Sequence, residues 1–171
     1  MTTTHQNKTL PETSIQTTHT DTTFTAQLYR QVTWLGITAG LRSMMPIAML
    51  TWSAPEASPR AKTLTSFLAI GELIGDKLPI IPSRLTPGPF IARLVIGAIS
   101  GALLCRRYQH PLAEGAMRGA LSAAIGTIAG SGYRTLTAQT TEVPDVVWAS
   151  IEDCAAFGLG KRATQAPSKA K

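Results

Sequence analysis

Glycines spaced four residues apart constrain this chain more than any other feature of its sequence. With 14 glycines in 171 residues, chance alone would give about one such pair. An interior glycine costs about 1 kcal/mol relative to alanine in a water-soluble helix, whereas in membrane helices this spacing lets two backbones approach closely. The sequence therefore predicts helices packed backbone to backbone through the glycine pairs Gly36/Gly40, Gly71/Gly75, Gly97/Gly101, Gly115/Gly119 and Gly126/Gly130.

Apolar segments carry these glycines, separated by polar or proline-rich stretches. The first has one charged residue, and at about 1.5 Å per residue it would rise about 30 Å, the thickness of a bilayer's hydrocarbon core. Trp34 and Trp52 lie near its ends, where interfacial aromatic residues are found, and Pro46 should kink it. The segments cover residues 32–52, 63–81, 91–105, 115–136 and 145–160.

These segments predict an all-α fold, a polytopic transmembrane bundle of four to five glycine-rich helices. A soluble bundle rich in alanine and glycine is the alternative, because the third and fifth segments are short for spanning. Residues 1–28 contain eleven threonines and almost no large apolar side chain, so we expect a disordered tail there. Residues 29–162 then form the transmembrane domain, and residues 163–171 a basic C-terminal tail.

Positive charge is distributed in a way that bears on partners and location. The formal net charge is +6, but the basic residues are scattered between apolar runs without the aromatic-rich stripe of a nucleic-acid interface. Membrane lipid is the expected partner instead, together with a small solute or ion and further copies of the chain. We expect a bacterial cytoplasmic membrane protein. If all five segments cross, the positive-inside rule puts the N-terminus outside and the C-terminus in the cytoplasm.

Charged side chains interrupt the second apolar segment. Glu72 and Asp76 stand four residues apart on one helical face, with Lys77 one position further on. Pro79 follows and cannot continue a regular helix. A charge at the bilayer centre costs about 2.5–3.5 kcal/mol. These side chains must therefore pair, line water or lie at segment ends.

Comparable charges occur in the first, fourth and fifth segments. A Gly-Leu-Arg-Ser sequence places Arg42 in the first segment, and a similar Gly-Tyr-Arg-Thr sequence places Arg134 near the end of the fourth. Each is followed by a segment with two acids, and in the second case these are Glu152 and Asp153. This echo is a weak sign of an inverted repeat, which many transporters use to build a site at the membrane midplane.

Two interpretations of these charges remain open. In the first, a transporter or channel-like protein binds a cation, proton or small polar solute at acids whose pKa values the basic residues set. In the second, a structural or lipid-binding protein uses Arg42 and Arg134 to neutralise acids across the bundle. The candidate site comprises Arg42, Glu72, Asp76, Lys77, Arg134, Glu152 and Asp153, with the helix-breaking Pro46 and Pro79 beside it.

Catalysis is less favoured than either interpretation, although paired carboxylates could act as general acid and base. Neither a serine nor a cysteine lies beside a histidine, and Cys105 and Cys154 lack metal-ligand spacing. The histidines are far apart in the sequence, so we expect no metal site and no cofactor.

Four short motifs resemble those of a bacterial family of small integral membrane proteins, domain of unknown function number 4126. The resemblance covers about residues 30–160 and implies a membrane location but no activity. This chain has Ile80 and Ile81 where members often carry an aspartate after the Lys-x-Pro element. The motifs are Ala39-Gly40-Leu41-Arg42-Ser43 with Pro46, Gly71-Glu72-x3-Asp76-Lys77-x-Pro79, Gly97-Ala98-x2-Gly101-Ala102 and Ser150-Ile151-Glu152-Asp153.

Overall fold

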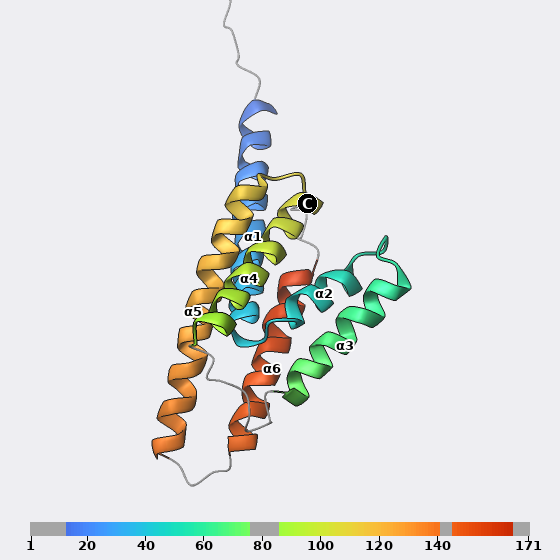
Figure 1. Cartoon of the computed structure of the whole chain (residues 1–171). Helices are drawn as coiled ribbons and strands as arrows, with labels where there is room; N and C mark the ends of the chain where they lie inside the picture. The colour runs from blue at the N-terminus through green and yellow to red at the C-terminus, as the bar shows by residue number, and fades with distance from the viewer. Residues whose placement is uncertain (1–12, 76–85, 141–144, 166–171) are drawn as a thin grey trace, which may run out of the picture.

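The computed structural model describes residues 13–75, 86–140 and 145–165. Within these residues the protein is helical and contains no strand, which confirms the predicted all-α class (Figure 1). Its helices are α1 (Thr13–Leu41), α2 (Met45–Ser53), α3 (Pro59–Gly75), α4 (Pro87–Arg107), α5 (Leu112–Thr140) and α6 (Asp145–Thr164).

Helices α1, α4 and α5 pack closely through glycines. A Cβ atom added to Gly36 of α1 would lie 2.5 Å from the Gly119 carbonyl oxygen, and one added to Gly97 of α4 would lie 2.6 Å from the same atom. Only a hydrogen fits at such an approach, so the predicted backbone packing is found here. Gly71 differs, because an added Cβ would meet no atom within 4 Å. The glycine pair on α3 therefore does not make the close contact expected at Gly71.

The apolar core lies beside this glycine contact. Side chains from four helices meet there, and Tyr29, Trp34 and Tyr108 pack against them. This cluster joins the second half of α1 to α2 and to the ends of α4 and α6. Its members are Leu28, Val32, Leu35, Leu50, Leu104, Cys105 and Ala163.

Residues 32–52 do not form the single kinked helix that the sequence predicts. Helix α1 ends at Leu41, and α2 begins at Met45 after a three-residue break. Pro46 lies in the first turn of α2, where a residue without an N–H group is tolerated. Helix α2 then leads toward the end of α4, where Arg107 donates to the Ser53 hydroxyl and carbonyl oxygens at 3.1 and 2.7 Å.

The N-terminal tail is shorter than predicted, because α1 already begins at Thr13. Phe24 packs edge-on against Tyr108 with ring centroids 5.8 Å apart, and Leu28 is fully buried. These contacts stabilise helix in a threonine-rich stretch whose composition alone would not. Helix α6 likewise continues past the predicted boundary at residue 162, since Ala163 is buried in the core.

The middle of α1 lies beside the end of α6 and the start of α5. The Gln31 side chain donates to the Gln165 carbonyl oxygen at 2.7 Å, and the Tyr29 hydroxyl donates to the Glu114 carboxylate at the start of α5. The expected placement of the two ends of the domain on opposite sides was therefore wrong. The break after Leu41 is the reason, because α2 turns back and removes one crossing from the count.

One of the described helices is long and apolar enough to cross a membrane. It is Pro87–Arg107, with a mean hydropathy of 1.8. Helix α2, with nine residues, is too short for this. Among the described residues, the prediction of four to five spans is therefore not confirmed.

Candidate functional site

The break between α1 and α2 leaves backbone groups at two helix ends in the middle of the molecule. The last carbonyls of one helix and the first amides of the next have no partners within their own helices. Buried without partners, they would cost free energy comparable to lost hydrogen bonds. In Figure 1 the break lies about midway along α5, beside α4 and α6. The surrounding helices supply the missing partners.

Arg93 of α4 binds the C-terminal end of α1. Its Nη1 atom donates to the Gly40 carbonyl oxygen at 2.6 Å and to the Leu41 carbonyl oxygen at 3.3 Å. The Thr127 hydroxyl of α5 also donates to Gly40, at 3.3 Å. A cation is favourable at this end because the helix dipole makes it partially negative. Arg93 is itself buried, so the contact satisfies both partners.

Glu72 of α3 binds the N-terminal end of α2. Its carboxylate accepts hydrogen bonds from the backbone amides of Ser43 and Met44, at 2.6 and 2.7 Å. Met44 precedes the first residue of α2 and makes no side-chain cap of its own. A carboxylate is favoured there by the partially positive helix end, and bonds of this kind are stronger than neutral ones. Glu72 therefore acts as a helix cap supplied from a neighbouring helix.

Arg42 lies in the break and is paired with α6. Its Nε atom donates to Oδ1 of Asp153 at 2.6 Å, and its Nη2 atom also contacts that oxygen. The Arg42 side chain is 2% exposed, so water cannot replace its partner. This ion pair fixes the turn between α1 and α2 against α6.

Arg134 of α5 makes a second ion pair with α6. Its Nε atom lies 2.8 Å from Oε2 of Glu152. The Glu152 side chain is 4% exposed and the arginine 23%. The adjacent acids of α6 thus bind arginines from two different helices.

Six charged residues around the break form what we call the buried charge network. It contains three arginines and three carboxylates, so its formal charges cancel. Of the predicted site residues, the structure brings four together as two ion pairs and uses Glu72 as a cap, while Asp76, Lys77 and Pro79 lie outside the described residues. The network comprises Arg42, Glu72, Arg93, Arg134, Glu152 and Asp153.

Sequence reasoning missed Arg93 and Thr127 as members of this region. Arg93 is an isolated charge at the seventh residue of α4, the one described helix that is long and apolar enough to cross a membrane, and that isolation was the available signal. Its target carbonyls could not be inferred, because Gly40 is more than fifty residues away in the chain. Within the described residues, no three His, Cys, Asp or Glu side chains come together in a metal-binding arrangement.

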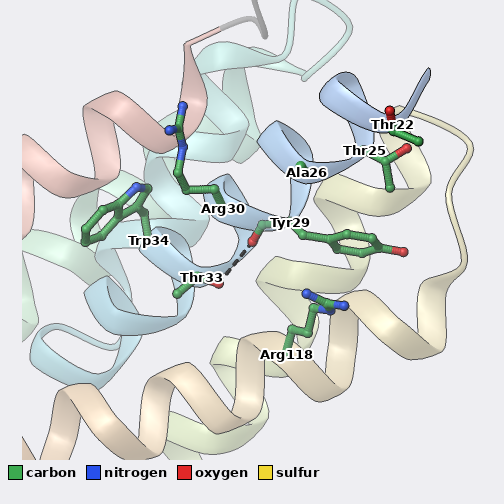
Figure 2. A pocket seen from close by; sticks show the side chains of 8 residues that line it. All are labelled: Thr22, Thr25, Ala26, Tyr29, Arg30, Thr33, Trp34 and Arg118. Carbon is green, nitrogen blue, oxygen red and sulfur yellow. Dashed lines mark hydrogen bonds between the residues drawn. The ribbon is translucent and has the colours of Figure 1, made fainter. Parts of the chain in front are cut away.

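A separate open groove lies along α1 at the end where α5 begins (Figure 2). The Arg118 guanidinium of α5 lies over the Tyr29 ring, 4.0 Å from its centroid. The hydrogen bond to Glu114 raises the pKa of the Tyr29 hydroxyl above its ordinary value. The groove has a volume of about 780 Å³ and is lined by Thr22, Thr25, Ala26, Tyr29, Arg30, Thr33, Trp34 and Arg118.

No protein-family model, curated protein or solved structure matches this chain. The resemblance to the family of small membrane proteins therefore stays a prediction from four short motifs.

Proposed function

We propose that this protein is a small multi-pass protein of the bacterial cytoplasmic membrane that binds anionic lipid at one end. One observation carries the proposal. Three helices expose continuous apolar stripes, and basic side chains gather where those stripes meet one end of the molecule.

The apolar stripes lie on α3, α4 and α5. Each side chain in them is between 42% and 71% exposed. Soluble monomers rarely expose contiguous apolar surface on this scale, whereas lipid is a suitable solvent for it. On α5 the stripe rises about 29 Å at about 1.5 Å per residue, close to the thickness of a hydrocarbon core. The stripes contain Leu64, Phe67, Leu68, Ile70, Ile74, Ile91, Val95, Ile99, Leu103, Met117, Leu121, Ile125, Ile128 and Leu136.

Basic side chains gather at the end of the molecule where α4 finishes and α5 begins. The contacts of Gln31 with Gln165 and of Arg107 with Ser53 bring four chain segments to this end. We call it the basic end, and by the positive-inside rule it faces the cytoplasm and its anionic lipids. Its basic residues are Arg30, Arg60, Lys62, Arg106, Arg107, Arg118, Lys161 and Arg162.

The buried charge network supports a structural role within this protein. Each of its arginines and carboxylates has a partner inside the molecule, and the formal charges cancel. It holds α1 and α2 as a hairpin that enters the bundle from the basic end and turns back. This arrangement favours the structural or lipid-binding interpretation of the charges.

Transport of a small solute or ion is the second candidate function. It is favoured by the helix break itself, because transporters often bind their substrates at the ends of discontinuous helices near the membrane midplane. In such a cycle an anionic solute would replace the Glu72 carboxylate at the Ser43 and Met44 amides. Glu72→Gln should then change solute flux in proteoliposomes while leaving the protein inserted. An unchanged flux would reject this role for Glu72.

Membrane insertion is tested by extraction and flotation. The full-length protein should stay in the membrane fraction through alkaline carbonate washing and require detergent for release. Reconstituted protein should float with vesicles in a density gradient. A chain that remained folded and monomeric in buffer without detergent would contradict the proposal.

A further inference from the structure

We propose that a groove along α2 binds a fatty acid, with the alkyl chain along α2 and the carboxylate at Lys161. This inference rests on the proposed membrane location and names a ligand class that the location alone does not supply. The groove has a volume of about 480 Å³. We call it the α2 groove, and its defining residues are Met45, Met49, Trp52, Ile70, Phe157 and Lys161.

Three helices form the α2 groove. Helix α2 packs against both α3 and α6, whereas α3 and α6 do not pack against each other within the described residues. In Figure 1, α3 runs back from the end of α2 toward the middle of the molecule. Helix α2 is therefore the floor of the groove, and α3 and α6 are its two walls.

Contacts at both ends of α2 fix the direction of the groove. Near the start of α2, Glu72 of α3 caps the helix and Asp153 of α6 pairs with Arg42. Near its end, the Trp52 indole N–H group donates to the Ser66 hydroxyl of α3 at 2.9 Å. The groove thus runs from the helix break in the middle of the molecule to the basic end.

The length of the groove matches one leaflet of a bilayer. The nine residues of α2 rise about 12 Å, and half of a hydrocarbon core is about 15 Å thick. A helix of that length would fill roughly twice the volume of the groove, so a helix of a partner protein does not fit. An extended alkyl chain does fit, with its methyl end near the midplane and its polar head at the membrane surface.

Large apolar side chains line the groove without filling it. Trp52 is 62% exposed, Ile70 53% and Phe157 57%. Beneath them α2 and α6 are in close contact, because a Cβ atom added to Gly160 would clash with the Met49 sulfur atom. Methionine side chains adapt to irregular apolar shapes. This lining suits a flexible hydrocarbon chain.

Lys161 gives the groove a positive charge at the basic end. It is the one charged residue among the described residues that line the groove, and none of them is acidic. Its side chain is exposed, and within the described part of the chain its ammonium group makes no ion pair or hydrogen bond. The nearby hydroxyls of Ser53 and Thr164 already donate to backbone carbonyls. One ammonium and space for one chain complement a fatty acid better than a two-chain phospholipid.

The test measures the binding of dodecanoate to the full-length protein in a non-ionic detergent by calorimetry, at about pH 8, where a carboxylate is charged. Ala69→Trp places a large ring on the α3 wall of the groove and should raise the Kd at least about tenfold, because the ring occupies space that the chain needs. The matched control is Leu68→Trp. It adds the same ring to the neighbouring residue outside the groove and should change the Kd less than about twofold.

The carboxylate contact is tested at Lys161. Lys161→Gln should raise the Kd for dodecanoate about fivefold and leave the Kd for the uncharged dodecanol unchanged. Arg162→Gln removes the adjacent charge, which does not line the groove, and should alter the dodecanoate Kd less than about twofold.

Three outcomes would overturn the proposal. Equal effects of Ala69→Trp and Leu68→Trp would mean that the chain does not lie in the groove. Equal effects of Lys161→Gln and Arg162→Gln would mean that the basic end attracts the anion without a defined contact. Tighter binding of dioctanoyl phosphatidylglycerol than of dodecanoate would identify the ligand as a two-chain phospholipid. If Ala69→Trp lost its thermal transition, Lys161→Gln decides, because an exposed side chain can be replaced without unfolding the protein.

Failure here is distinguishable from failure of the proposed function. Carbonate extraction reports insertion and does not depend on the α2 groove. Insertion of the parent protein with the same dodecanoate Kd in all four variants would reject the fatty-acid site alone, whereas loss of insertion in the parent protein would reject both.

Discussion

The arginines in the middle of this molecule have partners on other helices, whereas several arginines at its basic end face solvent. Arg42, Arg93 and Arg134 each bind a carboxylate or backbone carbonyls from another helix. At the basic end, Arg60, Arg106 and Arg162 are exposed instead. The comparison shows that solvent access determines which arginines need a partner inside the protein. An arginine requires one only where water cannot reach its guanidinium group.

The energetic reason is the cost of removing a charge from water. A buried charge without a partner costs several kcal/mol, while an exposed pair contributes about 0–1 kcal/mol. Substitutions in the two regions should therefore differ strongly in their effect on stability, and the following predictions test that contrast in order of decreasing effect.

Arg42→Ala should be the most destabilising of these changes. It leaves the Asp153 carboxylate without its buried partner, which costs about 3–5 kcal/mol when a buried pair is broken from one side. The free energy of unfolding, measured by SDS-induced unfolding in mixed micelles, should fall by that amount. Arg162→Ala, an exposed arginine at the basic end, serves as the control.

Removing the acid as well should restore part of the loss. The double variant Arg42→Ala/Asp153→Asn no longer contains an unpaired carboxylate at this site, so a double-mutant cycle should give a coupling free energy of about 1–3 kcal/mol. If the effects of the two single substitutions on the free energy of unfolding were additive, the two side chains would not interact. Arg42 would then not differ from the exposed arginines of the basic end.

Glu72→Ala should have the next largest effect. It removes two charge-assisted hydrogen bonds to the Ser43 and Met44 amides, and losing such partners costs about 2–3 kcal/mol. Amide hydrogen exchange should increase at the start of α2 in particular. Glu56→Ala removes an exposed acid from the loop before α3 and should leave both measurements unchanged. A uniform increase in exchange across the molecule would argue against a local cap.

Arg134→Ala should destabilise the protein by a smaller amount, about 1–2 kcal/mol. Its partner Glu152 is buried, but Arg134 is 23% exposed, so water can partly replace it. Thermal unfolding in detergent should place this variant between Glu72→Ala and the parent. If Arg134→Ala lowered the stability as much as Arg42→Ala does, the solvent exposure of the arginine would not determine the size of the effect.

The smallest effect is expected at the basic end. Arg60→Gln/Arg162→Gln should leave the thermal midpoint within about 2 °C of the parent, as surface substitutions usually do. A larger fall would show that these arginines have internal partners and would remove the distinction between the two regions.

Much of the helical organisation could be predicted from the sequence. The apolar segments from residue 63 onward correspond to α3, α4, α5 and α6, because hydrophobic composition and flanking polar residues are local properties. The close approach at Gly36 and Gly97 also followed from spacing. Arg42, Asp153, Arg134 and Glu152 were identified as members of one site, but their pairing was left open.

The break after Leu41 could not be predicted in the same way. Pro46 fits either a kink inside a helix or the first turn of a new one. Which of the two forms depends on Glu72 and Arg93. These residues, from distant parts of the chain, bind the free backbone amides and carbonyls at the two new helix ends. The extent of α1 beyond the expected tail depends likewise on Phe24 contacting Tyr108.

The sequence by itself determined that this chain forms glycine-rich helices with a few charges among apolar residues. Composition and spacing suffice for that, since each helix satisfies its own backbone. Only the tertiary structure decided which charge meets which, where α1 stops, and that both ends of the helical domain lie together. Those outcomes depend on partners far apart in the chain, whose contacts exist only once the helices have packed.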